Sequence, residues 1–128
     1  MSQKITEEEI LNLAARIAVQ AKIDGVKKSQ IENLLTSVEI SSDPKISPNV
    51  VALYAYRQAE RNEIGRGTAV LISEAMSRLS EAGGGREEAR KLLGFMKWIY
   101  ESLGERRMPR VAVKELKFQD VLKILKGG

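Results

Sequence analysis

The chain has 128 residues, 43% of them hydrophobic, a length that suits one domain with a single core. Cysteine and histidine are both absent, which excludes disulfides, thiolate chemistry, catalytic triads built on His or Cys, and most zinc sites. The net charge is +4, but residues 1–50 carry six basic and seven acidic side chains, whereas residues 51–128 carry fifteen and ten. This uneven charge favours an anionic polymer as the partner.

The sequence also lacks the signs of a membrane or secreted protein. No apolar segment approaches the roughly 20 uninterrupted residues of a membrane span. The first residues read Lys4, then Thr6 and three glutamates, rather than the apolar run of a signal peptide. We therefore expect a soluble, cytoplasmic protein with no membrane partner.

The first helix is predicted from a capping box, in which Thr6 caps the helix and Glu9 follows three residues later. Gly25 is a typical C-terminal stop. Between them, apolar residues recur at helical spacing and predict a buried face: Ile10, Leu13, Ala14, Ile17, Ala18 and Ala21.

A second capping box, formed by Ser29 and Glu32, predicts a helix of two or three turns. Lys27 and Lys28 stand just ahead of it as exposed candidates for contacts with nucleic acid. Residues 41–45 are rich in turn formers and are predicted to be a loop.

The stretch from Ser47 to Leu79 contains the longest apolar helical pattern in the chain. Ser47 is predicted as the helix cap and Pro48 as the first helical residue. We expect the core to come from this stretch and from the helix after it, over residues 51–59, 69–79 and 92–103.

Three arginines interrupt that pattern. Arg57 and Arg61 are four residues apart and share a helical face, and Arg66 lies between Gly65 and Gly67. The arginine fork suits phosphate better than the point charge of lysine does. These three arginines are therefore the main candidates for binding a phosphate backbone.

Gly67 and Thr68 leave two alternatives open. Free N–H groups at a helix start beside Arg66 could hold a phosphate. The same glycines could instead allow two helices to pack closely. Neither this glycine pair nor Gly83–Gly85 satisfies the pattern of a dinucleotide site or a P-loop.

The C-terminal half adds a further helix and a basic extension. The helix is predicted from about Glu87 to Leu103, with Gly104 as its stop. Residues 105–128 carry seven basic and three acidic groups, and a last helix is predicted over Gln119–Leu125. We expect an all-α protein, a single domain with five to six helices in all: a helical bundle over residues 1–104 and a basic extension over 105–128. Three more candidates for nucleic-acid contacts lie in that extension: Arg106, Arg107 and Arg110.

Two segments, YAYRQAERNEIGRGTAVLISEAM and EARKLLGFMKWIYESL, resemble the small helical subunit of CRISPR effector complexes, the archaeal type I-A subunit above all. The segment KKSQIENLLTSV is similar to the first conserved helical segment of the type III small subunits. The likeness covers residues 10–104. It implies a non-catalytic antiviral-defence protein without cofactor, whose partners are other effector subunits, copies of itself, guide RNA and target nucleic acid. Carried over to this chain, the nucleic-acid-binding role falls on Arg57, Arg61 and Arg66.

Two other classes of function stay open. In a helical adaptor or scaffold, the arginines would make ion pairs with Glu60, Glu63 and Glu74. An enzyme without His or Cys would depend on Glu, Asp, Lys or Tyr. Helix starts and neighbouring basic residues account for most of the acidic residues, so we expect no catalytic residue and no metal site.

Overall fold

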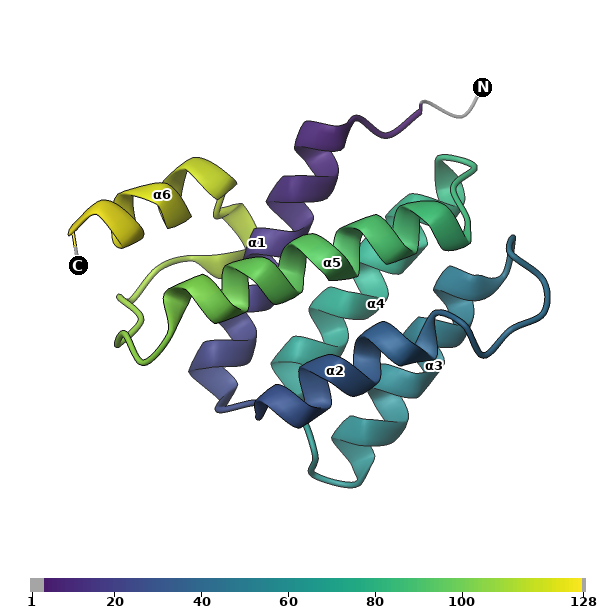
Figure 1. Ribbon diagram of the computed structural model, residues 1–128, viewed down its shortest axis with the longest axis horizontal. Coiled ribbons are helices and arrows are strands. Elements are labelled where there is room, and N and C mark those ends of the chain that lie inside the picture. Colours follow the sequence, from purple (N-terminus) through teal and green to yellow (C-terminus); the bar gives the residue numbers. More distant parts are fainter. Residues whose placement is uncertain (1–3, 128) are drawn as a thin grey trace.

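The computed structural model describes residues 4–127, and the regular structure in that range is entirely helical (Figure 1). The elements are α1 (Glu7–Asp24), α2 (Lys28–Ser37), α3 (Ser47–Glu60), α4 (Arg66–Glu81), α5 (Arg86–Leu103), the 3₁₀ turn η1 (Val113–Glu115) and α6 (Phe118–Gly127). No β-strand occurs among the described residues. The predicted all-α fold with six helices is therefore confirmed.

Two pairs of helices make most of the bundle. α3 and α4 pack on each other as neighbours along the chain, and α1 packs on α5 and also contacts α4. Figure 1 shows α5 running across α1 and α4, with α6 beside one end of α1. α2 fills the space between α3 and α5.

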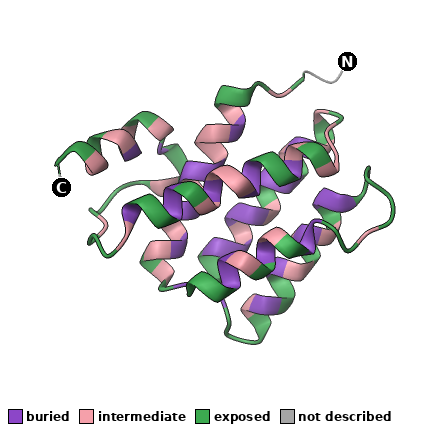
Figure 2. Ribbon diagram, viewed as in Figure 1, coloured by how far each residue is buried: buried purple, intermediate pink, exposed green. Residues whose placement is uncertain are grey.

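The core lies where the apolar stripes of these helices meet (Figure 2). The three predicted core segments are buried as expected, for example at Val51, Ile72 and Leu92, each with 0% of its surface exposed. α1 contributes as much as they do, with four alanines among its buried residues. Small side chains at a helix contact shorten the distance between helix axes, which explains how α1 fits against both α4 and α5.

Several predicted helix ends are confirmed. The hydroxyl oxygen of Thr6 accepts a hydrogen bond from the Glu9 N–H at 3.1 Å, and α1 begins directly after Thr6. Gly25 ends α1 with φ at 72°, a left-handed conformation that glycine adopts without steric cost. Gly104 ends α5 with φ at 57°.

The predicted caps at Ser29 and Ser47 are wrong. α2 starts one residue before Ser29, with Lys27 at the N-cap and no side-chain cap. Ser47 is the first residue of α3, and Ile46 is its N-cap. The buried Ser47 hydroxyl instead donates to the Val38 carbonyl at 2.7 Å, so it ties the end of α2 to the start of α3.

The basic extension packs onto the bundle. Leu116 and Val121 are buried in the same apolar cluster as the helices before them. Two hydrogen bonds join this part of the chain to α1: Arg16 Nε donates to the Leu116 carbonyl at 2.7 Å, and the Phe118 N–H donates to Asn12 Oδ1 at 2.8 Å. Residues 4–127 thus form a single compact domain.

Candidate nucleic-acid interface

The corner between α3 and α4 presents the three predicted arginines to solvent. Arg57 lies on the exposed side of α3, Arg61 is the exposed residue directly after this helix, and Arg66 is the first residue of α4. Within residues 4–127, no ion pair joins any of the three to a carboxylate. Their charge is therefore available to a ligand. We call these three residues the arginine corner.

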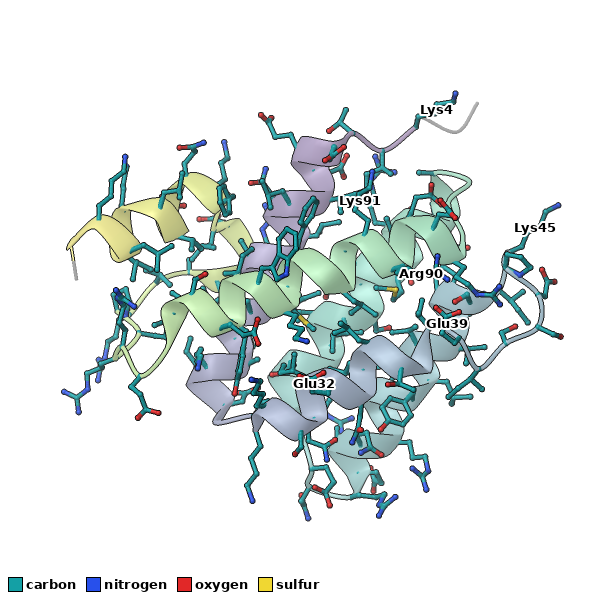
Figure 3. All side chains as sticks on the ribbon, in the orientation of Figure 1. Lys4, Glu32, Glu39, Lys45, Arg90 and Lys91 are labelled. Carbon is teal, nitrogen blue, oxygen red and sulfur yellow. The ribbon has the colours of Figure 1, made fainter. Side chains whose placement is uncertain are left out.

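The remaining arginines of the helices bind carboxylates or backbone carbonyls. Arg78 binds Glu9 at 2.7 Å, which raises the pKa of the guanidinium above its ordinary value. Arg90 reaches Glu39 at 2.7 Å, and Figure 3 shows these two side chains facing each other between α5 and the end of α2. Arg86 donates to the carbonyls of Val38 and Ser41. These three arginines hold helices together, whereas those of the arginine corner do not.

The guanidinium of Arg57 is joined to a buried chain of amides. One of its N–H groups donates to Gln58 Oε1 at 3.1 Å, and Gln58 Nε2 donates to Gln30 Oε1 at 2.8 Å. Gln30 Nε2 continues the chain to Glu63 Oε2 at 3.3 Å. Gln58 is 4% exposed and Gln30 9%, so these amides depend on each other for hydrogen bonds. A guanidinium has five N–H groups, which leaves Arg57 with donors for a phosphate.

The glycine pair proves to be a helix-packing device. The Thr68 N–H and hydroxyl both donate to Asp24 Oδ2, at 2.9 and 2.7 Å, and Gln20 Nε2 donates to Asp24 Oδ1 at 2.9 Å. A Cβ on Gly65 would overlap the Asp24 carboxylate. The last residue of α1 thus occupies the position that a phosphate would take at the start of α4.

Of the two predicted lysines, Lys27 lies near the arginine corner and Lys28 makes an ion pair. Lys27 and Arg66 line one surface cavity of about 670 Å³, together with Asp24, Glu60 and Glu63. Three carboxylates in its wall make this cavity a poor site for a phosphate. Lys28 binds Glu101 at 3.5 Å on the surface.

The predicted arginines of the extension lie elsewhere. Figure 1 shows the connector after α5 at the left of the view and the α3–α4 turn at the bottom. Arg106 donates to the Ser102 and Leu103 carbonyls at 3.0 and 3.3 Å and thereby closes the end of α5. Arg107 and Arg110 are exposed on the same connector.

Lys114 was not among the residues predicted to bind nucleic acid. It lies on η1 and lines a second cavity with Arg66, separate from the cavity that Arg66 lines with Lys27. Its only signal in the sequence is the general excess of basic residues after Gly104, which does not distinguish it from its neighbours.

No family model matches the chain, and no curated protein or solved structure was found to be similar to it. Across residues 4–127, no group of three or more acidic residues is placed to hold a metal ion. None of the described helices is long and apolar enough to cross a membrane. The resemblance to CRISPR small subunits therefore stays a prediction.

Proposed function

We propose that this chain is a non-catalytic subunit of an RNA-guided CRISPR effector complex and that it binds nucleic-acid backbone without regard to sequence. One observation carries the proposal: Arg57, Arg61 and Arg66 are exposed at one corner and form no ion pair with a carboxylate among residues 4–127, while Arg78 and Arg90 on other helices bind carboxylates. Exposed guanidinium groups without a carboxylate partner bind phosphate oxygens. Such contacts do not depend on the base sequence.

The competing scaffold hypothesis needs ion pairs from these arginines to Glu60, Glu63 and Glu74. No such pair forms among residues 4–127, and Glu63 instead accepts a hydrogen bond from Gln30. The contacts of the arginine corner thus favour the nucleic-acid hypothesis. The partners of the chain in this proposal are other effector subunits, copies of itself, guide RNA and target nucleic acid.

The test is a variant in which all three arginines of the corner become alanine. We expect its affinity for single-stranded RNA and DNA to fall uniformly across sequences, and the dependence of log K on log salt to lose about one unit of slope per arginine. Its melting temperature should fall only by the loss of the hydrogen bond from Arg57 to Gln58, because the three side chains make no ion pair among residues 4–127.

A matched control removes three other exposed positive charges: Lys45, Lys123 and Lys126. This control should bind nearly as well as the parent. An arginine variant that melts early yet binds normally, inside its assembly as well as alone, would show that the corner is structural. Equal losses in both triple variants would show that only net charge matters.

A further inference from the structure

A second cavity, of about 390 Å³, lies on the surface where α1, the start of α4 and η1 meet. Its apolar wall is formed by Val70, Leu71 and Val113, of which Leu71 is buried and the two valines are half-buried. Two exposed cations, Arg66 and Lys114, stand at its edge. The volume falls within the range of about 300–1,000 Å³ that is usual for small-molecule sites.

Two features keep this cavity open. Gly67 lies in the wall and has no side chain, and an added Cβ would come within 2.8 Å of Gln20 Nε2. Gln20 itself is held by its bond to Asp24, so its amide has a defined place at the cavity edge. The site is built from three separate segments of the chain, and one of them is the C-terminal extension.

The chemistry of the cavity specifies its occupant. An aliphatic wall next to two cations matches a molecule with an apolar or weakly polar surface and a negative charge beside it. A nucleotide in a single strand has this form, since its base is free to leave the stack and its phosphates flank it. A fully paired duplex keeps its bases stacked and offers only phosphates.

We infer that this cavity receives an unpaired base of single-stranded nucleic acid, while Arg66 and Lys114 bind the flanking phosphates. The inference rests on the proposed function, because it takes Arg66 as a phosphate ligand, and it extends that function in two ways. It names the single strand as the preferred substrate, and it gives the C-terminal extension a part in binding.

The experiment compares three ligands by fluorescence anisotropy: a short oligothymidylate, an abasic strand of the same length, and a hairpin duplex. The oligothymidylate and the abasic strand carry the same backbone charge, so the difference between these two reports on the base. We expect the oligothymidylate to bind about tenfold more tightly than the abasic strand. In a V70S/V113S variant, whose cavity wall is less apolar but uncharged, this preference should disappear while binding of the abasic strand is unchanged.

A second variant covers the case in which the double substitution unfolds the chain. Lys114→Ala should weaken all three ligands and lower the salt slope by about one, whereas Lys123→Ala, an exposed lysine of α6, should not. Equal affinity for all ligands, with no effect of V70S/V113S, would overturn the inference and leave the proposed function standing. Absence of binding to every ligand would overturn both. Binding of oleate at this cavity without binding of the oligothymidylate would assign it to an anionic amphiphile instead.

Discussion

Replacing Asp24 by Ala tests whether the end of α1 holds the start of α4. The carboxylate accepts three hydrogen bonds, two from Thr68 and one from Gln20. Thr68 has 0% of its surface exposed in the folded protein, so its N–H and hydroxyl depend on the Asp24 carboxylate as their acceptor. Loss of a helix cap costs about 1 kcal/mol, and a buried donor left without a partner costs about 1–3 kcal/mol. We therefore expect Asp24→Ala to lower the free energy of unfolding by about 3 kcal/mol.

The assay is urea denaturation followed by far-ultraviolet circular dichroism. The midpoint should fall while the slope m stays constant, because the folded state keeps the same overall burial. Asp43→Ala is the matched control: Asp43 accepts a backbone bond from Lys45 at 2.9 Å, but in an exposed loop. It should change stability by about 0.5 kcal/mol at most. The reasoning is refuted if the two alanine variants are equally stable.

The same variant has a consequence for ligand binding. Without the Asp24 carboxylate, free N–H groups at the start of α4 would face solvent beside Arg66, which is the usual arrangement of an anion site. Sulfate should then raise the melting temperature of Asp24→Ala more than that of the parent protein. An equal effect of sulfate on both proteins would contradict our interpretation that Asp24 takes the place of an anion.

Two further substitutions test other contacts. Gly65→Ala should cost about 1–3 kcal/mol, because its Cβ would overlap the Asp24 side chain, including the Asp24 Cβ at 2.6 Å, and an undiminished cost in an Asp24→Gly background would argue against that overlap. The Tyr100 hydroxyl donates to the Val26 carbonyl at 2.6 Å, and burial, with a smaller effect of Glu105, raises the pKa of Tyr100 above its ordinary 10.0. The folded state thus favours the neutral phenol, so this contribution to stability is complete below pH 10.0 and is lost as the pH rises through the folded-state pKa. Tyr100→Phe should cost about 1 kcal/mol at neutral pH and flatten the alkaline part of the stability curve relative to the parent, whereas parallel curves would exclude the phenol as the cause.

The arginine corner could be predicted in part. Four-residue spacing places Arg57 and Arg61 on one face of a helix, and the exposure of that face follows from the apolar stripe opposite it. The ionic partners could not be predicted. Glu60 and Glu63 are close in sequence to these arginines yet bind none of them. Arg78, in contrast, pairs with Glu9, which lies far away in the sequence on a neighbouring helix.

The positions of the helices follow from local features of the sequence. Apolar periodicity, the Thr6 cap and the stops at Gly25 and Gly104 are local features, and each acts through atoms within one or two helical turns. The caps predicted at Ser29 and Ser47 failed because a serine near a helix start can also bond to another segment, as Ser47 does.

The chemistry of the surface depends on how the helices pack and could not be predicted from local patterns. Thr68 donates a hydrogen bond to Asp24, and Lys114 lines one cavity with Arg66. In both pairs, the two residues come from different helices or turns. Contacts of this kind depend on the angles and distances at which helices pack. The combined shape of many buried side chains sets these angles and distances. A periodic pattern shows which face of a helix is buried, but it does not show which residue of another helix lies against it.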